Sequence, residues 1–363
     1  MINFSNPVTE YLFLKKKIDN KIATVLKSNS YILGKEVNKF EKNFSKFTQV
    51  KYSVGTSSGT DALILALKSL NIGKGDEVIT TSHTAVATVA AIVEVGAVPV
   101  FVDINNDFLM DVPKVSKIIS KKTKAIIAVH IYGMPVELNL LLKICKINNL
   151  KLIEDCSQAH GAEYNKKKVG SFGIVSCFSF YPTKNLSTFG DGGIVCTNSK
   201  RIYKKIKFLR EYGWDKKKRS RLHGINNRLD ELHASILNIK IKYLKLFNKK
   251  RLQAAKMYIS RIKNKDIVLP KIHDHKTSVF HLFVIRIQKK KRNRLIKHLL
   301  KNKIKTGIHY PFPIHQLKPF KAFCKGDLPI TEKISDEIIS LPMYPLISSL
   351  TVQHVVKAIN NFK

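Results

Sequence analysis

Apolar residues along the chain follow two alternating patterns. Short runs are apolar at nearly every position, at 76–81, 98–104, 124–131, 151–155, 174–180 and 193–197. Longer stretches between them carry apolar residues three or four positions apart, at 59–70, 84–95, 113–120, 135–148 and 199–211. The first pattern predicts strands buried on both faces, and the second predicts helices. Their alternation predicts an α/β fold whose large domain has a mostly parallel central sheet covered by helices.

Both ends of the chain depart from this alternation. Helical spacing predicts further helices at 9–27, 37–47, 229–262 and 291–302, and a strand-like run lies at 279–287. We place a domain boundary near residue 250, within the long helical stretch. The prediction is a large domain over residues 1–250 and a smaller C-terminal α+β domain over residues 251–363.

The composition is that of a globular protein. The 363 residues are 44% hydrophobic and 25% charged, and no apolar run approaches the ~18 residues that cross a membrane. The start, M-I-N-F-S-N-P, lacks the apolar segment of a signal peptide. Five cysteines without C-x-x-C spacing indicate free thiols in a reducing compartment rather than disulfides or a metal site. We therefore expect a cytoplasmic protein with no metal and no membrane partner.

The formal net charge of +38 raises the question of an anionic partner. A basic excess of this size is found in proteins that bind nucleic acid or anionic membranes. The lysines are spread along the whole chain, however, and short K-K-K runs fall near expected element ends and turns. We favour a compositional origin in A/T-rich coding, with attraction of anionic nucleotide substrates as the second reading. Nucleic-acid binding is the third reading, and we expect no nucleic-acid partner.

Polar residues with a shared chemistry follow two of the expected strands. Lys184 lies in S-F-Y-P-T-K-N-L, which begins at Ser179, and Asp155 and Gln158 lie in E-D-C-S-Q-A-H-G-A. Ligands of parallel sheets bind at the carboxyl ends of strands, where these residues are expected. A lysine can form a Schiff base with the aldehyde of pyridoxal phosphate, and a carboxylate can pair with its protonated pyridine nitrogen. The alternatives are a structural aspartate that caps the next turn and a solvated surface lysine.

A candidate phosphate site occurs earlier in the chain. In G-T-S-S-G-T-D-A-L (55–63) the end of a strand turns into a helix. Backbone N–H groups at a helix N-terminus bind phosphate, Gly59 would let it approach the backbone, and Ser58 and Thr60 would add hydroxyl donors. Taken alone, the same letters also describe an ordinary helix N-cap.

Together these motifs resemble the DegT/StrS family of nucleotide-sugar aminotransferases. The resemblance rests on S-F-Y-P-T-K-N-L-x-x-F-G-D-G-G, E-D-C-x-Q-A-H-G-A and G-T-x-S-G-T-D-A-L-x-L-A-L, and it extends from Y-I-L-G-K-E-V-x-x-F-E (31–41) to the final helices. It implies the aspartate-aminotransferase-like (type I) fold, pyridoxal 5′-phosphate as cofactor, and a homodimer with active sites at the subunit interface.

The resemblance also implies roles for individual residues. Lys184 would form the Schiff base, Asp155 would pair with the pyridine nitrogen, and Gln158 would contact the ring oxygen. The phosphate would be held by Ser179, Gly59, Thr60 and Asp61, and by Asn226 of a neighbouring subunit. His83 would stack on the cofactor ring, where the family usually has an aromatic residue. Candidates for substrate contact are Tyr181, Arg228, His309, Tyr310 and His315, although each aromatic or histidine could instead be a packed core residue.

Three further segments point to a subgroup. S-H-T-A-V-A-T-V-A-A-I (82–92), R-E-Y-G-W (210–214) and N-N-R-L-D-E-L (226–232) resemble aminotransferases that make 3-amino-3,6-dideoxyhexoses on dTDP. The resemblance implies transamination of a dTDP-3-oxo-6-deoxyhexose with glutamate as amino donor, for a glycan or a secondary metabolite. The alternative is transfer to C4 of a dTDP-, UDP- or GDP-4-keto-6-deoxysugar. Family lyases carry histidine in place of Lys184, and a non-catalytic sensor would not need Lys184, Asp155 and Gln158 together.

Overall fold

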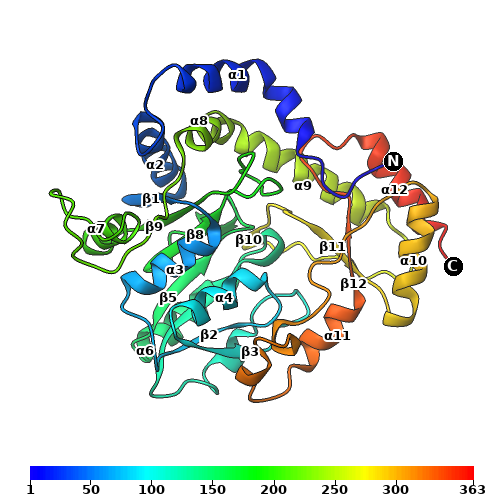
Figure 1. The fold of residues 1–363 in the computed structure, drawn as a ribbon. Coiled ribbons are helices and arrows are strands. Elements are labelled where there is room, and N and C mark those ends of the chain that lie inside the picture. Colours follow the sequence, from blue (N-terminus) through cyan, green and yellow to red (C-terminus); the bar gives the residue numbers. More distant parts are fainter.

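A seven-stranded sheet forms the centre of the protein, described here by a computed structural model of residues 1–363 (Figure 1). Its strands are β1 (Tyr52–Thr56), β2 (Glu77–Thr81), β3 (Val98–Val102), β4 (Thr123–Val129), β5 (Lys151–Asp155), β8 (Val175–Ser179) and β9 (Gly193–Thr197). Their order is β1-β9-β8-β5-β4-β2-β3. Only β9 runs against its neighbours, because it pairs antiparallel with both β1 and β8. The predicted mostly parallel α/β sheet is confirmed.

Helices cover this sheet. They are α2 (Lys35–Thr48), α3 (Gly59–Ser69), α4 (Val86–Glu94), α5 (Val112–Val115), α6 (Leu138–Ile147) and α7 (Lys200–Leu209). Helix α1 (Val8–Leu26) packs instead on α8 (Glu231–Lys240). Helix α3 packs on β8 and β9, whereas α2 and α7 pack on β1. Helix α5 is shorter than the predicted 113–120, because Ser120 donates its N–H to Thr123 Oγ1 (2.9 Å) in a turn that competes with the helix.

The predicted helix over 229–262 is two helices. Helix α8 (Glu231–Lys240) and helix α9 (Leu244–Arg261) are separated by the 3₁₀ turn η2 (Ile241–Tyr243). The last residue of α8, Lys240, is buried and donates to Ser187 Oγ (2.6 Å) while pairing with Glu10 of α1 (2.9 Å). These tertiary contacts fix the end of α8. The stretch contains neither Gly nor Pro, so its sequence gave no sign of the break.

The C-terminal part contains a second apolar core that starts at Ala254 and ends at Phe362. Its elements are β11 (Phe283–Arg286), β12 (Ile338–Leu341), α10 (Lys289–Lys301), α11 (Pro329–Glu337) and α12 (Ser349–Asn360). Strand β12 pairs antiparallel with β11 and was not predicted, because a four-residue strand directly after a helix leaves no separate periodic signal. Strand β11 is shorter than the predicted 279–287.

The N-terminus joins this C-terminal part (Figure 1). The N–H of Ile2 donates to the Lys303 carbonyl (2.8 Å), and the N–H of Met343 donates to the Phe4 carbonyl (2.9 Å). The division into domains at 1–250 and 251–363 stays a prediction. Residues 2–4 belong to the first of these ranges but are hydrogen-bonded to the second.

The remaining elements are short. A small sheet consists of β6 (Glu163–Tyr164), β7 (Lys167–Lys168) and β10 (Lys276–Thr277), and 3₁₀ turns are η1 (Ile131–Gly133), η3 (Ile314–Gln316) and η4 (Lys321–Phe323). All five cysteines are free thiols. No helix combines the length and the apolar character that crossing a bilayer requires.

A buried ion pair ties the first strand to its surroundings. Arg210 donates to Glu41 Oε1 (2.6 Å) and to the Gly55 carbonyl (3.2 Å), while the same Glu41 oxygen accepts the N–H of Gly55 (2.8 Å). Gly55 belongs to β1, the strand that leads into the candidate phosphate site. The pair therefore positions that strand end.

We expect Glu41→Ala to lower the free energy of unfolding by roughly 3 kcal/mol, because it leaves the Arg210 guanidinium buried without its partner. Urea denaturation would measure this. The matched control is Asp336→Ala, which breaks the exposed pair with Lys289 and should leave the midpoint unchanged. Equal effects of the two substitutions would show that the buried pair contributes no more to stability than the exposed pair.

Candidate active site

One cavity of about 440 Å³ lies where the strand ends meet the C-terminal part of the chain. Its lining comes from the start of α3, the end of β5, the loop after β8, and residues 281–282 and 309–310. The N-terminal segment adds Phe4 and Ser5. Because parallel strands end at one edge of the sheet, residues far apart in sequence meet there.

Lys184 lies on the wall of this cavity. Its backbone N–H donates to the Tyr181 carbonyl (2.9 Å), so a tight turn after β8 sets its position. Burial lowers the pKa of Lys184 to about 8, while the nearby Asp155 carboxylate acts to raise it. At pH 7 this pKa leaves ~10% of the amine neutral, against less than ~0.1% for an ordinary lysine. The side chain is therefore suited to attack an aldehyde.

Asp155 ends β5 and is buried, with 5% of its surface exposed. Its Oδ2 accepts the hydroxyl of Thr88 (2.9 Å), and its Oδ1 accepts the N–H of Ser157 (3.1 Å). These two bonds fix the carboxylate plane and leave further lone pairs for a cationic N–H in the cavity.

Gln158 is held from two sides. Its Oε1 accepts the N–H of Tyr132 (2.7 Å), and its Nε2 donates to the hydroxyl of Tyr310 (2.9 Å). Since the carbonyl oxygen is used by a backbone donor, the amide orientation is fixed. The second N–H of Nε2 remains for an acceptor in the cavity.

The N-terminus of α3 provides an anion cradle. Gly59 and Thr60 line the cavity, and their N–H groups belong to the first turn, which has no intrahelical acceptors. A Cβ on Gly59 would lie 2.6 Å from the Cβ of Ser179, so glycine alone allows this close approach. Ser58 caps the helix by accepting the N–H of Asp61 (3.0 Å).

Asp61 lies behind this cradle and is not part of the cavity wall. Its Oδ2 accepts the hydroxyls of Ser57 (2.5 Å) and Ser58 (2.7 Å). The carboxylate thus orients Ser57 and Ser58 beside the cradle, and the direct contact of Asp61 with a phosphate stays a prediction.

The donor set fits pyridoxal phosphate. A lysine with a lowered pKa, a fixed carboxylate, an amide N–H donor and an anion cradle line one cavity. Lys184 would meet the aldehyde, Asp155 the pyridine nitrogen, Gln158 the ring oxygen, and Gly59 with Thr60 the phosphate. No residue in the set has to change its hydrogen-bond role to accept the group.

Three of the predicted substrate residues line the same cavity. Tyr181 is half exposed at its mouth, and His309 and Tyr310 form another part of its wall. His309 Nδ1 bonds the hydroxyl of Ser340 (2.9 Å), and burial together with Lys184 lowers the pKa of His309. A neutral imidazole and two phenols can hydrogen-bond a sugar without adding charge to the site.

Four further predicted residues are not part of the cavity wall. His83 is 1% exposed, and its ring faces Tyr132 and Phe108 rather than the cavity, which its neighbours Thr84 and Ala85 line. The predicted stacking of His83 on the cofactor ring is thus not supported by its placement. His315 is also outside the cavity wall and is buried against Ser82. The same holds for Asn226 and Arg228, which both adjoin Glu211.

The structure adds a histidine that sequence reasoning missed. His281 lines the cavity, and burial, followed by the charges of Lys184 and Arg251, lowers its pKa well below the usual range. Both N–H groups of Asn185 are used, by Asn248 and Val279, so its oxygen accepts from His281 Nδ1 (3.1 Å). His281 Nε2 is consequently an acceptor. The strand-like letters around it gave no signal for this role.

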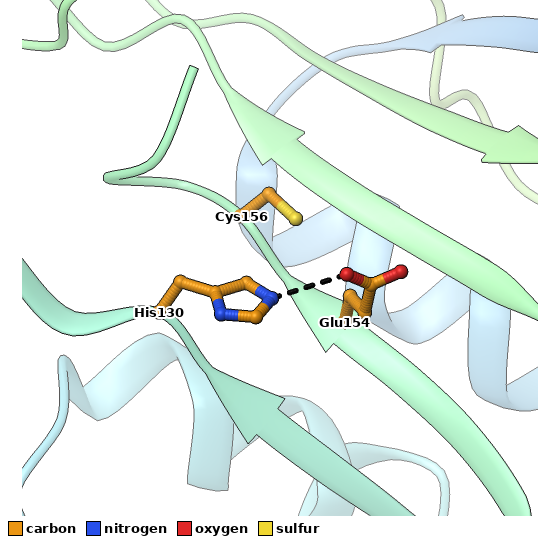
Figure 2. A group of neighbouring side chains, drawn as sticks. All are labelled: His130, Glu154 and Cys156. Carbon is orange, nitrogen blue, oxygen red and sulfur yellow. Dashed lines mark hydrogen bonds and ion pairs between the residues drawn. The ribbon is translucent and has the colours of Figure 1, made fainter. Parts of the chain in front are cut away.

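A buried cluster of His130, Glu154 and Cys156 lies at the ends of β4 and β5 (Figure 2). His130 Nδ1 accepts the N–H of Val136 (3.1 Å), so its Nε2 carries the proton donated to Glu154 (3.2 Å). Glu154 also accepts three backbone N–H groups from the segment 170–173, and its pKa lies below the ordinary value despite burial, because of these bonds and His130. The histidine has no free lone pair for a metal, and the cluster fastens the 170–173 turn.

The profile of the DegT/DnrJ/EryC1/StrS aminotransferase family matches residues 13–360. The chain belongs to this family. It is 43% identical to a dTDP-3-amino-3,6-dideoxy-alpha-D-galactopyranose transaminase of Aneurinibacillus thermoaerophilus, over 96% of each chain. It is 38% identical to a UDP-N-acetyl-3-dehydro-alpha-D-glucosamine 3-aminotransferase of Acidithiobacillus ferrooxidans, over 92% of this chain and 90% of the relative.

Solved structures agree with this assignment. DesV of S. venezuelae superposes with a TM-score of 0.96 at 36% identity, covering 99% of this chain and 97% of that one. NtdA of Bacillus subtilis, solved with bound cofactor PMP, has a TM-score of 0.89 at 30% identity, covering 95% and 80%. The predicted type I fold, the aminotransferase class and the pyridoxal phosphate dependence are thereby confirmed.

The lowered pKa of Lys184 in this aminotransferase can be measured directly. The rate at which the cofactor-free protein captures pyridoxal phosphate at Lys184 should rise with pH and level off above about 8, because only the neutral amine reacts. Borohydride reduction followed by peptide mass spectrometry would report Lys184 alone.

Asp155→Asn tests how the Asp155 carboxylate acts on the pKa of Lys184. Since the carboxylate raises the pKa of Lys184, its removal should move the midpoint to lower pH. Lys184→Ala provides the blank. A midpoint near the ordinary 10.5 in the unmodified protein would contradict the burial argument.

Proposed function

We propose that this aminotransferase converts a dTDP-3-oxo-6-deoxyhexose into the dTDP-3-amino-3,6-dideoxyhexose, with glutamate as amino donor. The observation that carries transamination is the shared cavity of Lys184 and Asp155, in which the lysine has a pKa of about 8. The substrate class is supported by the 43% identity to a dTDP-3-amino-3,6-dideoxyhexose transaminase over 96% of the chain.

Each residue has a defined task in this reaction. When bound, pyridoxal phosphate supplies the aldehyde and the electron sink for the carbanion. Asp155 keeps the pyridine nitrogen protonated, since Thr88 and Ser157 fix its carboxylate beside the cavity. The Lys184 Nζ takes a proton from Cα of glutamate, and in the second half-reaction it delivers one to C3 of the sugar.

The sugar would lie against Tyr181, His309 and Tyr310. His281 Nε2, an acceptor with a pKa well below the usual range, adds a site for a sugar hydroxyl. The net charge of +38 favours approach of the diphosphate by long-range attraction.

The active form would be a homodimer with shared sites, in the cytoplasm. Asn226 is exposed and does not line its own cavity, which supports a role for Asn226 and Arg228 in a partner's site. Exposed apolar side chains, including Phe13 at 52% and Phe189 at 45%, lie on and beside α1 and would be covered by a second subunit. The free thiols suit a reducing compartment.

The absorption spectrum tests the donor half-reaction. The protein loaded with pyridoxal phosphate should show a visible band that bleaches when glutamate is added, and Lys184→Ala should show neither the band nor turnover. Incubation with dTDP-3-oxo-6-deoxyhexose should then restore the band. If the band bleaches with glutamate but only 4-keto sugars restore it, the amine is transferred to C4 rather than C3. The absence of any band would contradict aminotransferase chemistry.

Shared sites can be tested by mixing two variants. Lys184→Ala and Asn226→Ala dimers, dissociated and reassociated together, should regain roughly a quarter of wild-type turnover, because half the dimers carry one intact site. Each variant treated alone is the control. Turnover equal to the mean of the two controls would place Asn226 in its own subunit's site.

A further inference from the structure

The segment 309–315 forms one wall of the cavity yet is mostly irregular. It carries His309 and Tyr310 on the cavity and ends in the 3₁₀ turn η3, and it contains no strand. Irregular backbone has few ladder bonds of its own, so side chains from elsewhere must hold it in place. Ser340 bonds His309, Gln158 bonds Tyr310 and Glu332 bonds His315. Ser82 bonds the segment as well, and so does Tyr132, which His83 supports.

His83 holds the first end of the segment through Tyr132. The Tyr132 hydroxyl donates to the His309 carbonyl, so it must accept the proton from His83 Nε2 (2.6 Å). The pKa of His83 is lowered to about 4 by burial, and its Nδ1 has no partner. A neutral imidazole protonated at Nε2 therefore satisfies the chain of bonds from His83 to His309.

Ser82 holds the other end. Its carbonyl accepts the N–H of Ile314 (3.1 Å), and its Oγ accepts the N–H of His315 (3.0 Å). His315 Nε2 faces the Glu332 carboxylate (3.0 Å), which can only accept, and in the neutral imidazole Nδ1 then has a lone pair for the Ser82 hydroxyl (2.7 Å). Ser82 thus makes three bonds to the segment, one through its carbonyl and two through its hydroxyl.

Tyr132 connects the segment to the cofactor side of the cavity. Its backbone has φ +57°, a left-handed conformation that is rare for a tyrosine, and from it the N–H donates to Gln158 Oε1 (2.7 Å). Gln158 in turn donates to the Tyr310 hydroxyl (2.9 Å). One residue therefore sets both the orientation of Gln158 and the position of His309.

We propose that Ser82 and His83 are positioning residues that fasten the segment 309–315 over the cavity, His83 through Tyr132 and Ser82 through His315. The consequence for turnover rests on the proposed function. His309 and Tyr310 are the substrate-side residues, so loosening the segment should weaken binding of the ketosugar. The cofactor contacts of Lys184 and Asp155 do not involve it.

Hydrogen–deuterium exchange of the full-length protein loaded with pyridoxal phosphate tests the proposal. Tyr132→Phe removes the hydroxyl that joins His83 to His309 and keeps the ring. Exchange in peptides spanning 305–317 should accelerate on the order of fivefold, and KM for the ketosugar should rise by a similar factor. The glutamate half-reaction should keep its rate. Ser82→Ala should accelerate exchange at the 314–316 end.

Two controls make the result specific. Tyr164→Phe removes another buried tyrosine hydroxyl, which donates to Glu137 (3.1 Å), and should change neither quantity. His83→Gln keeps an N–H donor near the Nε2 position and should behave almost as wild type, whereas His83→Phe should behave as Tyr132→Phe. If His83 instead stacked on the cofactor ring, His83→Phe would be tolerated and His83→Gln would shift the cofactor spectrum.

The outcomes separate this proposal from the proposed function. Unchanged exchange and KM in Tyr132→Phe and His83→Phe proteins with a normal cofactor spectrum would overturn the fastening role. An equal loss of the glutamate half-reaction would overturn it too, because the residues would then act on the cofactor. If exchange accelerates in the variants but the wild-type protein converts no ketosugar, the fastening role is upheld and the proposed substrate is rejected.

Discussion

The parallel pairing of β4, β5 and β8 is the constraint on which the site depends. Their register sets Val129 beside Asp155 and Asp155 beside Cys177, so the chain leaves all three strands at one edge of the sheet. A carboxylate is stable at such a buried edge only if hydrogen bonds and a cation compensate its lost hydration. Thr88, Ser157 and Lys184 provide this compensation, and the same lysine obtains its lowered pKa from the burial.

The cavity lies between two parts of the chain that have separate apolar cores. The strand ends supply the groups that bind a cofactor, and the C-terminal part supplies His281, His309 and Tyr310. Residues from both sides are linked by hydrogen bonds, above all from Gln158 to Tyr310 (2.9 Å). The cavity is therefore built from both parts of the chain, and the proposed sugar contacts come from both, with Tyr181 on one side and His309 and Tyr310 on the other.

The basic character of the chain has little to do with this architecture. Basic residues that matter structurally are few and buried, such as Arg210 with Glu41 and Lys240 with Glu10. Most of the other basic residues are solvated. The ion pair of Lys15 with Asp19, for example, is exposed and therefore contributes little to stability. A charge of +38 can therefore coexist with a buried, hydrogen-bonded active site.

The sequence by itself determined the sheet, its covering helices and the central chemistry. Strands buried on both faces are apolar throughout, and Lys184, Asp155, Gln158 and the Gly59 cradle lie in local motifs at strand ends, so short windows of sequence contain the signal. Only the tertiary structure decided the break between α8 and α9, the pairing of β12, and the places of Asp61, His83 and His281. Those features depend on contacts between distant residues, as between Ser82 and His315, which are 233 positions apart. No local periodicity encodes which buried polar groups will find each other once the chain has folded.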